Sequence, residues 1–554
     1  MRVASESFME EGTGHTSWGG RITAQSPPRR LLPAVWTPPG RGGGLVALRP
    51  MAPRFVRSTL LAAALMALTP ACGENEVRPS LDLLSDSCAG TQPLAGVTHL
   101  RFRVTGPGLD TPRERVSTVA WTEADVPAVP SGTARVLEVR AYVGAPDQGG
   151  QLVSLGRSVP FDVTEGQAPK VRMFLRRLGE FVPVNLASAP RTCSLPVATR
   201  AAHTATTLPD GRVFITGGYE PRADGTRPVT GTTEVFNPAD GTFSPGPDVG
   251  ARAFHTASLL PDGRVFLAGG AASFAPVTLQ PSSLLLDPNT GARNDLPLKA
   301  ARYQHAAAVN TEGQVLLVSG RAADGSTVDT VEGYDSAKGR LVAYPAPFSF
   351  VDAALTVERG GRIFQVVGGA SGLGAVRDVA AFTFADGEIL TLAAGAYLRG
   401  PRVGAAVALL GRPDEDPLPL VMGGFDGLDP AKGARPVGAS EFLNGVVQVE
   451  DGPALMPRGN LCAVTLPDGR VMALGGRGTG IGTTYAQPWV ELITPHAGAQ
   501  PTVLGLTLMP QPRVWHTCSA LPDGSVLVVG GVDDSTGEIR ANSEALVVMP
   551  PPRD

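Results

Sequence analysis

The chain has 554 residues, with 47 Lys and Arg against 51 Asp and Glu and a formal net charge of −4. That length suffices for two or three domains, and a hydrophobic content of 43% is ample for packed cores. Beyond residue 71 there is no basic block, which argues against nucleic acid as a partner. Most of the 68 glycines stand at fixed offsets inside apolar runs, which indicates a turn-rich all-β protein.

The amino-terminal residues are expected to act as a targeting signal rather than to form a folded domain. Residues 1–50 are rich in Gly, Pro and Arg without periodicity, and we expect them to be disordered or to precede the true start of translation at Met51. Residues 51–71 place Arg54 and Arg57 before a short apolar run, as a secretory signal does. The run is too short for a spanning helix.

The end of this signal, LTPAC at 68–72, resembles the lipobox of bacterial lipoproteins. The resemblance implies that Cys72 is acylated and becomes the mature amino terminus, although Thr69-Pro70-Ala71 departs from the usual letters. Gly73, rather than Asp, follows the cysteine, so we expect anchoring in the outer membrane. The alternative is an ordinary secretory signal with an incidental cysteine. The polar residues 72–95 are expected to form a tether.

Residues 96–178 are expected to form a small β-sandwich, of immunoglobulin-like type. THLRFRV (98–104), RVLEVRAYV (135–143) and VRMFLRR (171–177) are its candidate strands. The first two alternate apolar and polar residues, and all three are separated by Gly, Pro and Asp turns. This is the pattern of half-buried antiparallel strands. A spacer or adhesion-type module is the expected role.

One unit recurs through the rest of the chain. LPDGRVFITGG (208–218) returns as LPDGRVFLAGG (260–270), LPDGRVMALGG (466–476) and LPDGSVLVVGG (521–531). Seven units align, 49 to 55 residues apart, a period that suits a four-stranded propeller blade. Their marks are Gly217-Gly218, Gly269-Gly270, Ser319-Gly320, Gly368-Gly369, Gly423-Gly424, Gly475-Gly476 and Gly530-Gly531.

The pattern predicts that each unit consists of a strand, a Pro-Asp-Gly turn, a buried strand and a glycine pair. The glycines permit unusual backbone angles and close approach of the neighbouring blade. The last unit lacks a fourth strand, and EFVPVNLAS (180–188) precedes the first unit as a natural substitute. We predict that this segment completes the last blade and closes the ring, which removes exposed sheet edges.

Residues 180–554 resemble the kelch-repeat family of β-propellers. The shared elements are an Arg opening strand one, His three residues on, the Asp-Gly turn, the Gly-Gly pair and strands such as TTEVFNP (232–238). Unit four lacks the Arg and His, with Val351 and Ala354 at the expected offsets, and unit five carries an insertion at 411–419. The resemblance implies a seven-bladed kelch-type β-propeller after a small sandwich, in an all-β protein.

Two sets of repeat residues are candidates for chemistry. Forked guanidinium groups near one channel mouth would suit carboxylates, sulfates or sugars; pairing with repeat glutamates is the alternative. Four imidazoles around an axis could bind a metal; local hydrogen bonding is the alternative, and no metal or other cofactor is expected. The candidate binding residues are Arg200, Arg252, Arg302, Arg458 and Arg513; the histidines are His203, His255, His305 and His516.

Galactose oxidase, a relative of the kelch propellers, carries copper on this scaffold through tyrosines, a Cys–Tyr cross-link and further histidines. This chain has 7 Tyr in 554 residues and no tyrosine-bearing motif that matches such a site. Four cysteines besides Cys72 allow three disulfide pairings. Cys462 and Cys518 lie in adjacent blades and could form a bridge or stay as thiols, and Cys88–Cys193 would bracket the sandwich.

The expected function is a non-enzymatic lipoprotein of the cell envelope, a monomer that binds a protein or glycan. Loops of variable length on a rigid ring suit recognition, and the variable segments are 219–231, 411–419 and 425–438. The alternatives are a carbohydrate-active or oxidative enzyme on a galactose-oxidase-like propeller and a structural envelope component.

Overall fold

The computed structural model describes residues 76–553 except 87–91, 185–198, 346–349, 359, 373, 386–387, 413–414, 429–431, 447, 480–483, 537 and 542–543. Residues from Cys72 on form one compact unit. The predictions for residues 1–71, for Cys72 and for Cys88–Cys193 lie outside the described residues. No helix in the described part of the chain is long and apolar enough to cross a bilayer.

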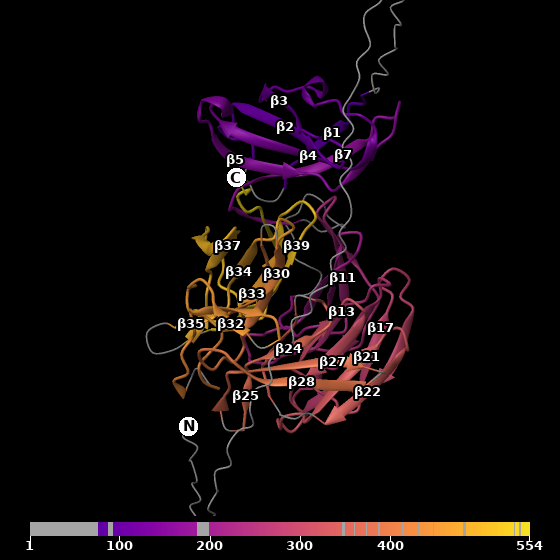
Figure 1. Ribbon diagram of the computed structural model, residues 1–554, viewed down its shortest axis with the longest axis vertical. Coiled ribbons are helices and arrows are strands. Elements are labelled where there is room, and N and C mark those ends of the chain that lie inside the picture. Colours follow the sequence, from indigo (N-terminus) through magenta and orange to yellow (C-terminus); the bar gives the residue numbers. More distant parts are fainter. Residues whose placement is uncertain are drawn as a thin grey trace, which may run out of the picture. The chain divides into compact units, whose positions relative to one another are not determined.

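A small β-sandwich comes first, drawn in indigo and purple in Figure 1. Its seven strands are linked in the order β1-β7-β5-β4-β2-β3, with β6 on β4. They are β1 (Ser80–Leu84), β2 (His99–Thr105), β3 (Arg113–Thr118), β4 (Gly132–Val143), β5 (Gln151–Arg157), β6 (Phe161–Val163) and β7 (Lys170–Arg177), with 3₁₀ turns η1 (Glu123–Asp125) and η2 (Pro146–Gln148).

Period-two alternation builds the sandwich core. Leu100, Phe102 and Val104 of β2 are fully buried, while the residues between them are partly exposed. Part of the predicted tether belongs to this domain, because β1 pairs in parallel with β7, Ser80 opposite Lys170. This strand escaped the sequence reading because its partner lies far along the chain.

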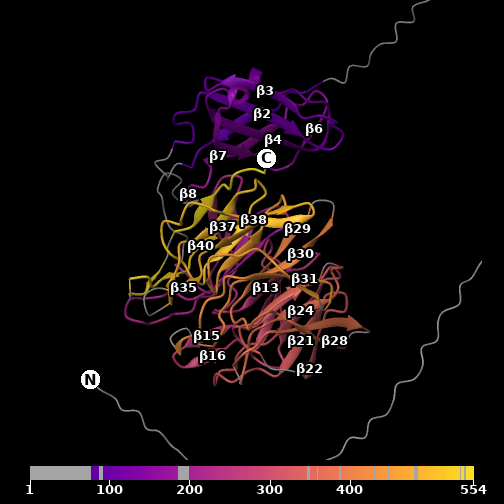
Figure 2. The same cartoon turned by 60° about the vertical axis from the view of Figure 1, so that its left-hand side comes forward.

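Seven four-stranded blades follow, coloured from magenta to yellow in Figures 1 and 2. Blades 1 to 3 are β9 (Thr204–Thr207), β10 (Val213–Thr216), β11 (Thr233–Asn237), β12 (Thr242–Pro245); β13 (Thr256–Leu259), β14 (Val265–Ala268), β17 (Ser282–Leu286), β18 (Arg293–Pro297); β19 (Ala306–Val309), β20 (Gln314–Val318), β21 (Thr330–Asp335), β22 (Arg340–Pro345). Blades 4 and 5 are β23 (Ala354–Val357), β24 (Phe364–Val367), β27 (Asp378–Ala385), β28 (Glu388–Tyr397); β29 (Ala406–Arg412), β30 (Glu415–Met422), β31 (Ser440–Asn444), β32 (Gln448–Asp451). Blades 6 and 7 are β33 (Cys462–Thr465), β34 (Val471–Leu474), β37 (Val490–His496), β38 (Ala499–Gly505); β39 (Thr517–Ala520), β40 (Val526–Val529), β43 (Leu546–Val548) and β8 (Phe181–Pro183).

The ring is closed, as predicted. Strand β8 pairs antiparallel with β43, Val182 opposite Val547, and so supplies the fourth strand of blade 7. The first strands of successive blades contact one another in order from β9 to β39, and β39 contacts β9. The first strand of each blade is therefore the innermost one, and no blade edge is left open at the point of closure.

The glycine pairs let neighbouring blades approach each other. Gly217 and Gly218 have φ of +62° and +100°, and the amide of Gly218 donates to the carbonyl of Arg252 in the next blade at 2.8 Å. A Cβ on Gly217 would stand 2.3 Å from that same carbonyl oxygen. The predicted reason for the glycine pair is thus confirmed.

Short hairpins extend four blades beyond the glycine pair, on the face where the first strands begin. They are β15 (Ala271–Phe274) with β16 (Val277–Leu279), β25 (Ala370–Ser371) with β26 (Gly374–Ala375), β35 (Arg477–Thr479) with β36 (Thr484–Ala486) and β41 (Val532–Asp533) with β42 (Arg540–Ala541). In the other three blades a single bridge takes their place, such as Tyr219 with Val229 and Phe425 with Pro436. Segment 219–231 and the described residues of segment 425–438 therefore lie on this face. The described residues of segment 411–419 lie at the opposite end of the strands, where they lengthen the β29–β30 hairpin.

Candidate functional site

The five predicted arginines are buried in the propeller, each with 2% or less of its surface exposed. Arg200 pairs with Glu234 at 3.0 Å and Arg302 with Glu332 at 2.5 Å, and Arg458 pairs with Glu491 in the same way. Arg513 donates to the carbonyls of Gly530 and Glu544. Ion pairs or hydrogen bonds within the blade therefore engage these four guanidinium groups. The arginines do not belong to the candidate site described below.

Among the described residues Arg252 has no glutamate partner, because Leu284 stands on the third strand of blade 2 where blades 1, 3, 5 and 6 carry the glutamate. Its guanidinium donates instead to the carbonyls of Val249 and Gly269. Burial lowers the pKa of Arg252 to about 10, with Asp295 acting in the opposite direction.

A sixth arginine belongs to the set and was missed. Arg402 of blade 5 is 1% exposed and pairs with Glu441. It stands 21 residues before Gly423, rather than 17, because the longer β29–β30 hairpin shifts the count. Blade 4 shifts by one residue, so Phe350 and Ala353, rather than Val351 and Ala354, occupy the arginine and histidine positions.

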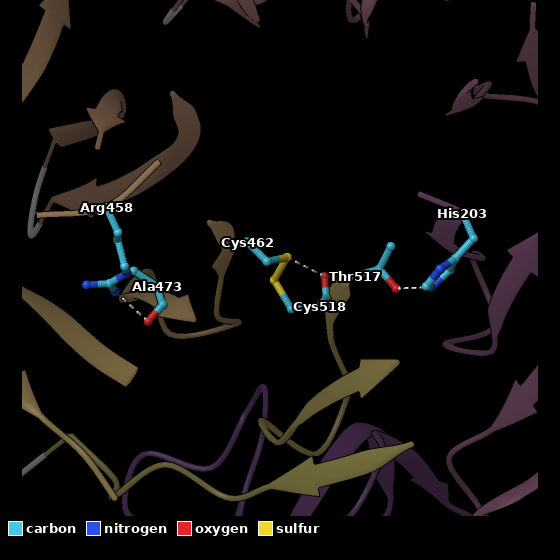
Figure 3. The surroundings of a disulfide bond; sticks show 6 residues. All are labelled: His203, Arg458, Cys462, Ala473, Thr517 and Cys518. Atoms are coloured by element: carbon cyan, nitrogen blue, oxygen red, sulfur yellow. Dashed lines mark hydrogen bonds between the residues drawn. A yellow bond between two sulfur atoms is a disulfide. The ribbon is translucent and has the colours of Figure 1, made fainter. Parts of the chain in front are cut away.

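The four repeat histidines lie between blades. The Nε2 atom of His255 is 3.1 Å from the hydroxyl of Thr204 in the preceding blade, and that of His305 is 2.9 Å from the hydroxyl of Thr256. His203 makes the same contact with Thr517 at 2.8 Å (Figure 3). Local hydrogen bonding, the alternative to a metal ring, accounts for these three side chains.

The corresponding link between blades 6 and 7 is covalent. Cys462 occupies the position of the threonine, and it forms a disulfide with Cys518 of β39 (Figure 3). The sequence left open whether these cysteines were bridged; the structure has the bridge, with Cα atoms 6.0 Å apart.

The copper set of galactose oxidase does not fit the described residues. No group of three or more His, Cys, Asp or Glu in this part of the chain could hold a metal ion. The repeat histidines are buried between blades, and Tyr219 contacts the aromatic residues of the channel mouth described next. Burial raises the pKa of Tyr219 to about 12, which opposes the phenolate that a metal ligand requires.

One residue in each blade has a left-handed backbone, immediately before the histidine position. These residues have φ between +50° and +64°, and each stands between the arginine and the first inner strand. We call them the axial ring: Ala202, Phe254, Gln304, Asp352, Gly404, Asn460 and Trp515. Bulky residues such as Phe and Trp rarely adopt this conformation, and strained positions of this kind gather at functional sites.

Backbone hydrogen bonds join the axial ring from blade to blade. The amide of Ala202 donates to Trp515, that of Phe254 to Ala202 and that of Gln304 to Phe254, at 2.9–3.0 Å. Gly404 donates to Asp352 and Asn460 to Gly404 in the same way. Because these links pass from one innermost strand to the next, the axial ring encircles one mouth of the channel.

One half of the axial ring is aromatic. Phe254 lies edge-to-face with Trp515 at a centroid distance of 5.8 Å, although they come from blades 2 and 7, with only the small Ala202 between them. Tyr219 stacks on Phe254 at 6.0 Å, and Phe274 completes the cluster. Trp515 and Phe254 are only partly buried, so part of this aromatic surface faces solvent.

Charged groups border the aromatic half. Arg477 lies 5.8 Å from the ring centre of Trp515 and donates to Asp534 at 2.5 Å. The carboxylate of Asp534 also accepts from the amide of Ala486. A hollow of about 210 Å³ lies among Tyr219, Trp515, Arg477 and Asp534, and a wider one of about 690 Å³ adjoins it along residues 222–229.

The other half of the axial ring is polar. Arg321 donates to the side-chain oxygen of Gln304 at 3.1 Å and lies 3.7 Å from the carboxylate of Asp352. Desolvation raises the pKa of Asp352, while the charge of Arg321 opposes that rise. The mouth thus offers an aromatic platform beside hydrogen-bonding groups, the combination typical of small-molecule sites.

The repeat histidines carry a testable pH dependence. Burial, together with the charge of Arg302, lowers the pKa of His305 to about 3, below its ordinary value of 6.5. The unfolded chain therefore binds the proton first, and this stability is lost as the pH falls below 6.5. We expect His305→Leu, which copies Leu461 of blade 6, to lose about 2 kcal/mol less unfolding free energy than wild type between pH 7 and pH 5.

Denaturant titrations at the two pH values measure this difference. The matched control is His496→Leu, a change at an exposed histidine of β37, which should leave the acid loss as in wild type. Equal acid losses in wild type and His305→Leu would contradict the assignment of a buried neutral imidazole.

Comparisons with known proteins give partial matches. Galactose oxidase from Gibberella zeae is 47% identical over 76 residues, which is 13% of this chain and 11% of galactose oxidase, and a second sequence from that species gives the same values. The chain thus matches about a tenth of the length of these curated relatives. The solved structure of YjhT aligns with 56% of this chain and 99% of its own, at 13% identity and a TM-score of 0.42. No family model matches.

The repeat, the closed ring and the partial match define the class: the chain carries a kelch-type, galactose-oxidase-like propeller of seven blades behind a small β-sandwich. The matched relative is named as an oxidase, which is an enzyme.

Proposed function

We propose that this protein is a non-enzymatic recognition module of the cell envelope, which is lipid-anchored through Cys72 and binds a glycan at the axial ring. The observation that carries the glycan assignment is the half-aromatic, half-polar mouth. A sugar ring has an apolar face of C–H groups that lies flat on an aromatic side chain, and hydroxyls at its edge that need hydrogen-bonding partners. Trp515 supplies the platform, and Arg477, Asp534 and Gln304 supply polar groups around it.

Rigidity at the mouth supports recognition. The backbone of the axial ring is held by hydrogen bonds between blades, so little order has to be gained when a ligand binds. Segments 219–231 and 425–438, singled out by their variable length, reach this face and can contact a ligand larger than one sugar.

The test is a glycan array of neutral and acidic oligosaccharides, followed by titration calorimetry with the best-bound member. Trp515→Ala should lower its affinity at least tenfold, about 1.4 kcal/mol, because the platform is removed. Tyr397→Ala is the matched control: Tyr397 is 53% exposed on the outer strand β28, and its removal should leave affinity unchanged.

The result that would overturn the glycan assignment is an empty array together with protein captured by wild type and lost by Trp515→Ala, which would make the ligand a protein. Loss at both variants would place the site elsewhere. If neither assay finds a ligand, the structural envelope role is favoured instead.

The partial identity with galactose oxidase favours an oxidative enzyme as the second candidate function. It predicts stoichiometric copper in the purified protein and hydrogen peroxide release with galactose. Metal analysis and a peroxide assay on the same preparation decide between this candidate and the recognition module.

A further inference from the structure

A second cleft lies away from the axial ring, between the sandwich and the turns of blades 6 and 7. It encloses about 220 Å³, and its walls carry five arginines against three carboxylates. The arginines are Arg103, Arg140, Arg157, Arg470 and Arg553.

The sheet directs two of these arginines, Arg103 and Arg157, into the cleft by its register. Arg103 of β2 stands opposite Glu138 of β4, which stands opposite Arg157 of β5. Their neighbours Val104 and Val139 are fully buried in the sandwich core. Because side chains alternate between faces, this row lies on the outer face of the sheet, where it meets the propeller side of the cleft.

The carboxylates in the cleft are already engaged. Glu138 accepts from Arg140 at 2.5 Å, and Asp468 pairs with Arg470 at 2.7 Å. Asp523 pairs with the buried Arg176 at 2.8 Å, outside the lining set. None of the three carboxylates is therefore left to pair with the remaining arginines of the cleft.

Two guanidinium groups are left over, one on each wall. Arg103 pairs with Glu114 at 3.0 Å, outside the cleft. Among the described residues neither Arg157 nor Arg553 has a carboxylate partner, and Arg553 donates to the carbonyl of Pro495 at 3.1 Å. An arginine that faces a cleft without a carboxylate is suited to an anion, which its forked donors can hold at two points.

We propose that this cleft is a phosphate-binding site, in which Arg157 and Arg553 hold a phosphate group between the sandwich and the propeller. Two opposed guanidinium groups suit a tetrahedral dianion, whose oxygens point to both walls at once. Clefts between domains are common ligand sites. The site is separate from the axial ring, and its occupation does not depend on the glycan assignment.

The experiment measures binding of inorganic phosphate to the full-length protein at pH 7 by titration calorimetry, with ionic strength held constant by sodium chloride. We expect saturable binding, and at least a tenfold loss of affinity in Arg157→Gln and in Arg553→Gln. The matched control is Arg293→Gln, whose arginine lies on β18 in an exposed pair with Asp295, and which should bind phosphate as wild type does.

Three results would overturn the proposal. Absence of saturable phosphate binding is the first, and equal losses in Arg157→Gln and Arg293→Gln are the second. The third is saturable binding of succinate in a parallel titration, at higher affinity than phosphate and lost in Arg157→Gln, which would make the cleft a dicarboxylate site. Circular dichroism of each variant confirms that a loss of binding is not a loss of fold.

Discussion

Replacing Arg302 by Met is expected to lower the free energy of unfolding by about 3–5 kcal/mol. Arg302 is fully buried, and it donates to Glu332 at 2.5 Å and to the carbonyls of Ser319 and Thr330. Its removal leaves the carboxylate of Glu332 buried without its cation. The amides of Lys299 and Ala300, which also donate to Glu332, offset only part of that cost. Guanidinium titration followed by intrinsic fluorescence measures the change.

Two controls separate burial from charge. Arg293→Met breaks an exposed pair, in which about half of each side chain is accessible, and should cost less than about 1 kcal/mol. The double variant Arg302→Met with Glu332→Leu should be more stable than Arg302→Met alone, because no unpaired charge is then buried. If Arg302→Met and Arg293→Met cost the same, the buried pair does not stabilise the blade as argued.

The propeller could be predicted from the sequence because its turns and its contacts between blades require particular residue types at fixed positions in each repeat. Gly211 has a φ of +85° in a tight turn, in which the side chain of Asp210 accepts a hydrogen bond from the amide of Arg212. The Pro-Asp-Gly letters predict that turn. The glycine pair predicts close packing of neighbouring blades. The last repeat has no fourth strand after Val548, which predicted that another segment, now seen as β8, closes the ring, since a propeller without it would keep an open edge.

What the sequence did not reveal depends on position in space rather than on repetition. A fixed count back from the glycine pair missed Arg402, because the first hairpin of blade 5 is longer, and it misplaced the blade 4 positions by one residue. Strand β1 was assigned to the tether because its parallel partner β7 lies about 90 residues away. Such long-range pairing leaves no local signal.

The axial ring was hidden inside the motif itself. In RAAH, RAFH, RYQH and RVWH the Arg and the His recur, while the third letter changes from Ala to Phe, Gln and Trp. The constant letters are buried between strands and blades, whereas the third letter is the left-handed residue at the mouth. Variation between a constant Arg and a constant His is the signal that could have found the site, because scaffold positions restrict residue type and a recognition surface does not.

A buried charge group links the sandwich to the propeller. Arg176 of β7 forks to Asp86 at 2.8 and 3.2 Å and reaches Asp523 of blade 7 at 2.8 Å. Burial lowers the pKa of Arg176, but the charges of Asp86 and Asp523 outweigh it and raise the pKa overall. Its side chain is 1% exposed, so both carboxylates rely on it for charge compensation.

We expect Arg176→Met to cost about 3–5 kcal/mol of unfolding free energy, because two carboxylates would be left buried without a cation. In calorimetry the variant should unfold earlier than wild type, and the sandwich should separate from the propeller as its own transition. Arg172→Met is the matched control on the same strand; it breaks a pair with Asp82 in which both side chains are at least a third exposed, and should cost less than about 1 kcal/mol. If the two variants melt together, the contact between the domains is held by apolar packing rather than by this charge group. In that case Arg176 is not the group that holds the two walls of the phosphate cleft in place.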